Sequence, residues 1–101
     1  YNFNETLKLD TLEVNVSKRS VTRSNKSISL TSKEFDILVY MLLNQGNIVT
    51  HTQLQEKIWG ISENTSSNII NVFIHHLRHK IDSEGEKVLI KTIRGSGYKI
   101  E

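Results

Sequence analysis

The apolar residues between positions 68 and 81 constrain the fold of this chain more than any other feature of its 101 residues. In the stretch NIINVFIHHLRHKI, apolar side chains recur at intervals of four, three and four residues, which is the spacing of one buried face on an α-helix. The residues on this face are Ile70, Ile74, Leu77 and Ile81. The stretch therefore predicts a helix, from about residue 67 to residue 81, that adds one narrow stripe to a hydrophobic core.

The opposite face of the predicted helix is polar, and no acidic residue occurs from Asn64 to Ile81. Amide side chains can hydrogen-bond to base edges, a valine can contact the methyl group of thymine, and imidazole and guanidinium groups can meet phosphates. The face therefore suits insertion into the major groove of DNA, with an ordinary solvated helix face as the alternative. Its residues are Asn68, Asn71, Val72, His75 and His79, with His76 and Arg78 on the flanks.

Length and composition limit the class of protein. A chain of 101 residues is long enough for one modest core and too short for two. It has no cysteine, which excludes disulfides, thiolate nucleophiles and cysteine-based zinc sites. The whole formal excess charge of +2 falls in residues 66–101, together with three of the four histidines, which favours a polyanionic partner. No stretch resembles a membrane span or a signal peptide, so we expect a soluble, cytoplasmic protein without a membrane partner.

The first thirty residues alternate between apolar and polar side chains with a period of two. This pattern predicts four short antiparallel strands with turns at residues 10–11, 17–19 and 24–25. A helix should follow, because Thr31 and Glu34 have the spacing of a capping box and the residues after them are apolar on nearly all sides. Such a helix is central to the core, because it needs cover on more than one side.

A second, shorter helix is predicted where Thr50 and Gln53 repeat the capping pattern, and Gly60 provides its end. Residues 61–67 are mostly Ser, Asn and Thr, and they should form a surface loop before the third helix. Two short capped segments followed by the helix at 67–81 are compatible with a helix-turn-helix arrangement.

Two β-rich runs, residues 88–93 and 98–100, close the sequence and are joined by RGSG at residues 94–97. The glycines permit a tight turn, and an arginine at a hairpin tip has little core to join. We therefore expect Arg94 to reach a narrow DNA minor groove, where the negative potential is enhanced. The predicted fold class is α+β: a four-stranded antiparallel N-terminal sheet, three helices and a C-terminal β-hairpin.

Motifs of catalysis are absent from the sequence, which has no phosphate-binding glycine loop with lysine and no HExxH. His75 and His79 have a spacing that can chelate a divalent metal, but no carboxylate stands at a matching position on their helix. We therefore expect no enzyme, no metal and no cofactor. The alternatives are a protein-interaction module whose basic face meets an acidic partner, and a small hydrolase whose site the sequence does not display.

Four segments in order, LTSKEFDILVYML, LQEKIWG, NIINVFIHHLRHKI and TIRGSGYKI, resemble the winged-helix effector domain of the OmpR/PhoB family of bacterial response regulators. The resemblance covers essentially all of residues 1–101. It implies a winged helix-turn-helix domain that binds double-stranded DNA, with the helix at 67–81 in the major groove and the wing at 94–97 in the minor groove.

The resemblance also implies partners beyond this chain. A separate N-terminal receiver domain, absent here, would be phosphorylated through a sensor kinase and would drive formation of a homodimer on tandem half-sites. The same winged-helix domain also occurs attached to other input modules. RNA polymerase would contact the loop formed by Ile61, Ser62, Glu63, Asn64 and Thr65.

Individual DNA contacts follow from the same resemblance. They are Trp59, Ser67, Asn68, Asn71, Val72, His75, His76, Arg78, His79, Thr92, Arg94 and Tyr98. Trp59 would donate its indole N–H to a phosphate, although a tryptophan at a helix end is as often a core anchor. The ring of Tyr98 could equally pack under the hairpin. No structural role is expected for Asn71, because it lies opposite the core stripe.

Two departures from the family pattern affect the expected binding. His75 and His76 stand where relatives commonly have arginine, and Phe73 stands where histidine or tyrosine is common. Loss of arginine removes bidentate recognition of guanine, so DNA binding should be weaker. Because histidine gains charge near neutral pH, the affinity should rise as the pH falls from 8 to about 6.

Overall fold

The computed structural model describes residues 6–60, 66–82 and 85–101. The N-terminal part is a four-stranded antiparallel sheet in the order β1-β2-β3-β4. The predicted alternation is confirmed, since Leu12, Val14 and Val21 are buried in the core, whereas Glu13 between the first two is exposed. The strands are β1 (Thr6–Leu9), β2 (Leu12–Asn15), β3 (Ser20–Arg23) and β4 (Lys26–Ile28).

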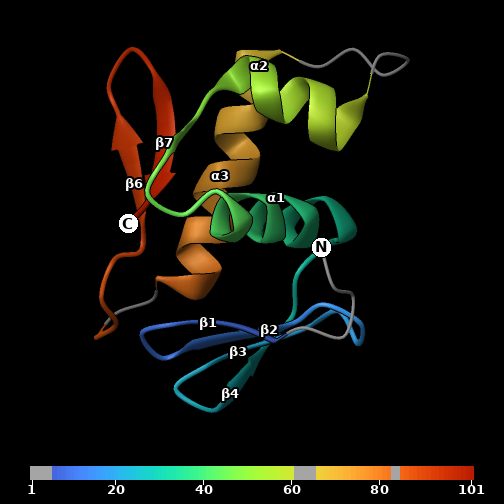
Figure 1. The fold of residues 1–101 in the computed structure, drawn as a ribbon, viewed down its shortest axis with the longest axis vertical. Helices are drawn as coiled ribbons and strands as arrows, with labels where there is room; N and C mark the ends of the chain where they lie inside the picture. The colour runs from blue at the N-terminus through green and yellow to red at the C-terminus, as the bar shows by residue number, and fades with distance from the viewer. Residues whose placement is uncertain (1–5, 61–65, 83–84) are drawn as a thin grey trace.

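Helix α1 (Ser32–Leu43) crosses the middle of the molecule next to this sheet (Figure 1). The predicted capping box is present. Thr31 Oγ1 accepts from the backbone N–H of Glu34 at 3.3 Å, and Glu34 Oε1 accepts from the N–H of Thr31 at 2.9 Å. The buried apolar side chains of the helix point to more than one side, which makes α1 the centre of the core, as predicted. They are Phe35, Ile37, Leu38, Val39, Met41 and Leu42.

The second helix begins and ends as predicted, but the hydrogen bonding of its second half differs from that of an α-helix. Helix α2 (His51–Leu54) starts with the predicted capping box, and the chain then widens into a π-helical turn, η1 (Gln55–Trp59). The N–H of Gly60 donates to the carbonyl of Gln55 at 2.9 Å, and this five-residue step closes the wide turn. The turn places Trp59 in the core, where the residue is only 8 % exposed.

Helix α3 (Ser67–Ile81) is the helix predicted from the apolar stripe. Its first turn is capped by Ser66, whose Oγ accepts from the N–H of Ile69 at 3.3 Å. The prediction of the buried face is confirmed, because all four stripe residues are buried: Ile70, Ile74, Leu77 and Ile81. In Figure 1, α3 runs from the end of the molecule that carries α2 to the end that carries the N-terminal sheet.

Strands β6 (Ile90–Ile93) and β7 (Gly97–Ile100) form the predicted hairpin, which is the wing. The short segment β5 (Ile48–Val49) pairs with β7, giving a second sheet in the order β5-β7-β6. This close pairing needs a glycine, because a Cβ on Gly97 would lie 2.2 Å from the carbonyl oxygen of Val49. The tip of the wing extends to the end of the molecule that carries α2 (Figure 1).

Arg23, at the end of β3, connects the N-terminal sheet to the segment between α3 and the wing. The residue is 2 % exposed, and its guanidinium donates to the carbonyl oxygens of Ile81 at 2.6 Å and Lys87 at 2.7 Å. It also forms ion pairs with Asp82 at 3.0 Å and with Asp10 at 3.2 Å. A buried guanidinium with this many partners fixes the position of the sheet relative to α3.

Glu34 connects α1 to α3. Its carboxylate is buried and receives the ammonium group of Lys80, on α3, at 2.7 Å. Burial opposes ionisation of Glu34, but the hydrogen bonds from Lys80 and from the backbone N–H of Thr31 outweigh burial and hold the pKa of the carboxyl below its ordinary value.

Candidate nucleic-acid interface

The polar face of α3 is exposed to solvent, as predicted. Val72, in the middle of this face, is 50 % exposed. An exposed aliphatic side chain among amides and imidazoles is what contact with a thymine methyl group requires. The exposed residues of the face are Ser67, Asn68, Asn71, Val72, His75, His76 and His79.

Three histidines form a patch on the C-terminal half of α3. The rings of His75 and His79 are stacked, with centroids 6.4 Å apart and an interplanar angle of 25°, and the ring of His76 lies 6.0 Å from that of His75. Within the described ranges, no group of three or more potential ligands could hold a metal ion. The patch offers hydrogen-bond donors to an anionic partner, and the expected rise in DNA affinity at lower pH stays a prediction.

Arg78 and Thr92 hold the wing against α3. Nη2 of Arg78 donates to Oγ1 of Thr92 at 2.8 Å. The family resemblance implied that each of these residues contacts DNA, and the structure also bonds one to the other. A hollow of about 270 Å³ lies between α3 and the wing, so the helix and the hairpin form one continuous surface. Its lining residues are Asn71, Ile74, His75, Arg78, Thr92 and Tyr98.

The expectation that Asn71 has no structural role is wrong. Its Oδ1 accepts hydrogen bonds from the hydroxyl of Tyr98 and from Nε2 of His51, the latter at 3.0 Å. The three side chains come from α3, β7 and α2, so a single amide oxygen joins three elements. Helical periodicity placed Asn71 opposite the core stripe, on a face expected to meet solvent. In the structure this part of α3 also contacts the wing, through Tyr98.

His51 is the residue that sequence reasoning missed. It follows the cap of the second helix, 20 positions before Asn71, and no periodic pattern relates the two. The ring of Tyr98 packs under the hairpin, edge-on to His51 with centroids 5.3 Å apart. Burial raises the pKa of Tyr98 above its ordinary value, against the opposing charge of Arg78. The packing interpretation of the tyrosine ring is thus confirmed.

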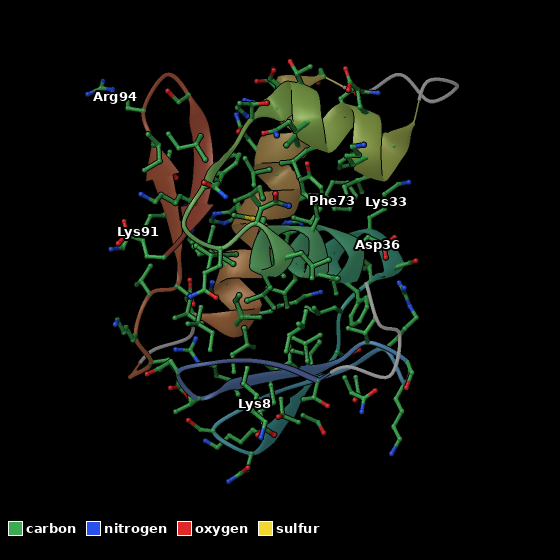
Figure 2. The ribbon with its side chains drawn as sticks, in the orientation of Figure 1. Lys8, Lys33, Asp36, Phe73, Lys91 and Arg94 are labelled. Carbon is green, nitrogen blue, oxygen red and sulfur yellow. The ribbon has the colours of Figure 1, made fainter. Side chains whose placement is uncertain are left out.

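Arg94 is exposed at the tip of the wing. In Figure 2 its side chain points away from the body of the molecule, at the end that carries α2. No hydrogen bond or ion pair engages it within residues 6–60, 66–82 and 85–101. The guanidinium is therefore available to a partner that the chain itself does not contain.

Trp59 lies in the core beneath α3. Its ring meets the ring of Phe73 edge-on, with centroids 5.2 Å apart, and the ammonium group of Lys33 lies 5.3 Å from its centroid. Phe73 therefore has a packing role against the ring of Trp59. The core-anchor interpretation of Trp59 is confirmed, and a phosphate contact through its indole N–H stays a prediction.

Comparison with known proteins identifies the family of this chain. The family model described as "Transcriptional regulatory protein, C terminal" matches residues 25–100. The chain belongs to this family, the winged-helix DNA-binding domains of OmpR/PhoB response regulators. The family is a regulatory one, so this output domain is not an enzyme.

Two curated relatives illustrate the similarity. The transcriptional regulatory protein YkoG of Bacillus subtilis is 42 % identical over 95 residues, which are 94 % of this chain and 42 % of YkoG. The transcriptional regulatory protein CusR of Escherichia coli is 40 % identical over 90 residues, which are 89 % of this chain and 40 % of CusR. The output domain thus spans less than half the length of the curated relatives it matches.

A solved structure confirms the winged-helix fold. The RstA DNA-binding domain of Klebsiella pneumoniae, crystallised in complex with the RstA box, superimposes with a TM-score of 0.83 at 25 % identity. The match covers 95 % of this chain and 96 % of that domain. In the described part of this output domain, no helix has the length and apolarity needed to cross a membrane. The predicted polymerase loop, residues 61–65, lies outside the described residues.

Proposed function

We propose that this output domain binds double-stranded DNA sequence-selectively, with α3 in the major groove and the tip of the wing, residues 94–97, in the minor groove. The observation that carries the proposal is the joined surface of α3 and the wing. Arg78 bonds to Thr92, Asn71 bonds to Tyr98, and the tip with Arg94 extends to the end of the molecule that carries α2 (Figure 2). The RstA domain, which was crystallised with its box, supports this mode because it has the same fold over nearly the same length.

The roles of individual residues follow from their positions on this surface. Four exposed residues of α3 would meet base edges: Asn71, Val72, His75 and His76. Phosphates would be met in the first turn of α3 by Ser67 and Asn68, because backbone N–H groups there lack helical acceptors. The remaining contacts on the DNA backbone or in the minor groove are Trp59, Arg78, His79, Thr92, Arg94 and Tyr98.

Selection of bound sequences from a pool of random duplexes, followed by titration of the selected duplex at several salt concentrations, tests this proposal. Groove binding predicts an enriched sequence and a log–log salt slope equal to several released counterions. Equal affinity for all duplexes, or no binding at all, would instead favour a protein-interaction module with an acidic partner. The enriched sequence separates selective from non-specific binding, because both kinds of DNA binding release counterions.

For the longer protein, we propose the assembly that this family resemblance implies. A receiver domain preceding this chain would be phosphorylated through a sensor kinase, and two output domains would then occupy tandem half-sites as a homodimer in the cytoplasm. RNA polymerase would contact residues 61–65. The support is that the output domain spans less than half the length of relatives named as transcriptional regulatory proteins. Footprinting of the longer protein with and without phosphorylation tests it, and protection of a single half-site in both states would contradict it.

A further inference from the structure

The side-chain oxygen of Asn71 is fully occupied inside the domain. A carbonyl oxygen has two lone pairs, and Oδ1 of Asn71 accepts both from Tyr98 and from His51. Because Oδ1 has no proton of its own, the tyrosine hydroxyl and His51 Nε2 are the donors in these two bonds. His51 Nε2 also lies 3.2 Å from the tyrosine oxygen, so the three side chains form one network.

The amide nitrogen of Asn71, unlike the oxygen, has no hydrogen-bond partner among the described residues. In the described part of the chain no acceptor takes its two N–H groups, although the residue is exposed and lies at the edge of the hollow between α3 and the wing. In the structure Oδ1 is the atom of the amide that faces Tyr98 and His51, so the amide nitrogen faces away from both residues. The outward-facing group of Asn71 is therefore a donor and not an acceptor.

This restriction matters for base recognition. In the major groove, adenine presents an acceptor at N7 beside a donor at N6, whereas guanine presents two acceptors, N7 and O6. An unrestrained asparagine matches adenine, because it can accept from N6 and donate to N7 at the same time. An asparagine whose oxygen has no free lone pair cannot accept from N6 of adenine. Its N–H groups would instead point at the N–H groups of N6, and two donors facing each other repel.

We propose that Asn71 is a specificity-determining residue that offers DNA only donors and therefore selects guanine against adenine at one position of the bound sequence. The inference rests on the DNA binding proposed above and extends it to the identity of a base. His51 and Tyr98 are positioning residues in this scheme, since they act through the orientation of the Asn71 amide.

The first test replaces only the outward-facing group. Asn71→Asp keeps an oxygen for Tyr98 and His51 and substitutes a carboxylate oxygen for the N–H groups. On the duplex selected by the wild-type domain, and on versions that differ at one base pair, the wild type should favour guanine over adenine on the order of tenfold. The aspartate variant should lose that preference and favour bases that donate there, such as cytosine through N4.

The added negative charge of Asn71→Asp lowers affinity for every duplex, so a matched control is needed. Asn68→Asp adds the same charge one turn away on α3, at an amide that is not bonded to Tyr98 or His51. It should lower affinity for all duplexes by a similar factor and leave the ratio of guanine to adenine at the Asn71 position unchanged. The preference ratio, rather than the affinity, is therefore the readout.

A second variant releases the amide without changing it. Tyr98→Phe frees one lone pair of Asn71 Oδ1, so adenine should become acceptable and the guanine-to-adenine ratio should fall toward one. A purely structural role of the hydrogen bond would lower affinity without changing this ratio. Thermal unfolding of each variant establishes that the folded domain is being compared.

The possible results separate the inference from the proposed function. Suppose that the wild type prefers adenine at the base pair where Asn71→Asp changes the base preference. That result would overturn the assignment of Asn71 as a donor only. An unchanged base preference in both Asn71→Asp and Tyr98→Phe would remove Asn71 from the specificity-determining residues. A wild-type domain that enriches no sequence at all would instead contradict the proposal that the domain reads DNA.

Discussion

At the scale of single residues, the proposed DNA-binding surface uses side chains that also hold the domain together. Arg78 and Thr92 bond to each other, and Asn71 bonds to Tyr98 and His51. Removing one of these side chains therefore changes the position of the wing as well as a contact to DNA. Substitutions that keep the internal hydrogen bond, such as Asn71→Asp, separate the two effects, whereas alanine substitutions do not.

Gly97 gives a prediction at the same scale. In Gly97→Ala the new Cβ would meet the carbonyl oxygen of Val49, so β5 and β7 cannot pair without moving. The expected loss in the free energy of unfolding is about 2 kcal/mol or more, measured by urea denaturation. Gly95→Ala is the control, because Gly95 has a positive φ of 78° but no atom within 4 Å of an added Cβ, and its cost should be about 1 kcal/mol. Equal losses in the two variants would contradict the role given to the close approach.

At the scale of elements, α3 has two faces with different tasks. The apolar face meets α1 and fixes the orientation of the helix, and the polar face is thereby held outward. The ion pair of Glu34 with Lys80 fixes the same two helices at a second point. Its contribution depends on pH, because only the ionised carboxylate attracts the ammonium group.

Glu34→Gln tests this contact between the helices. The variant keeps an acceptor for the N–H of Thr31 and loses the charge that Lys80 meets, so it should be less stable at pH 7 by about 1–2 kcal/mol. The pKa of Glu34 is lowered in the folded state, so its stabilisation is complete above the unfolded-state pKa of about 4.3 and is lost as the pH falls through the lower folded-state pKa.

Urea denaturation of both proteins from pH 7 down to pH 3 measures this difference in stability. The gap between wild type and Glu34→Gln should narrow in the acidic part of the range. Asp36→Asn is the matched control on the same helix, because Asp36 pairs with Arg19 at the surface at 3.1 Å and should contribute little at any pH. A gap that stays constant with pH would contradict the role of the charge.

The elements themselves were largely predictable from the sequence, because their signals are local. The capping boxes at Thr31 and Thr50 span four residues each, and the stripe on α3 repeats within two turns. The π-helical turn before Gly60 was not predictable, since it lies at the end of its helix, where no later apolar side chains reveal a shift in periodicity.

The candidate site was predictable only in part. The sequence placed the polar face of α3 and the tip of the wing on the surface, because periodicity determines which way a side chain faces. It did not show the bond from Asn71 to Tyr98, whose partners are 27 residues apart, or the bonds from Arg23 to Ile81 and Lys87. Such hydrogen bonds depend on how the elements pack against one another, and no local pattern in a single amino-acid sequence predicts them.

At the scale of the whole molecule, Arg23 joins the N-terminal sheet to the half of the domain that carries the proposed DNA-binding surface. The side chain of its partner Asp82 is only 1 % exposed. If either charge were removed, water could not reach the other charge to replace the lost hydrogen bonds. Loss of the guanidinium removes one donor from the buried carboxylate of Asp82 and from the carbonyl oxygens of Ile81 and Lys87. The sheet and α3 should therefore lose stability together.

Arg23→Ala should reduce the free energy of unfolding by about 3 kcal/mol or more, which for a domain of this size lowers the melting temperature by more than about 10 °C. Arg23→Lys should fall between wild type and alanine, because it keeps the charge but not the planar set of donors. Circular dichroism and denaturant titration measure both variants. A loss no larger than that of the exposed Arg19→Ala, expected at about 1 kcal/mol or less, would contradict the role of Arg23 as a connector.

The central claim is that one end of the molecule, formed by α3 and the tip of the wing, meets DNA. The salt dependence of duplex affinity, measured for wild type, Arg94→Ala and Lys8→Ala, tests it most directly. Arg94 lies at the tip of the wing, and Lys8 lies in the N-terminal sheet at the other end (Figure 2), where it forms an exposed ion pair with Glu13. Arg94→Ala should weaken binding and reduce the slope of log affinity against log salt by about one, while Lys8→Ala should change neither. An unchanged slope in Arg94→Ala, or an equal change in Lys8→Ala, would contradict the account.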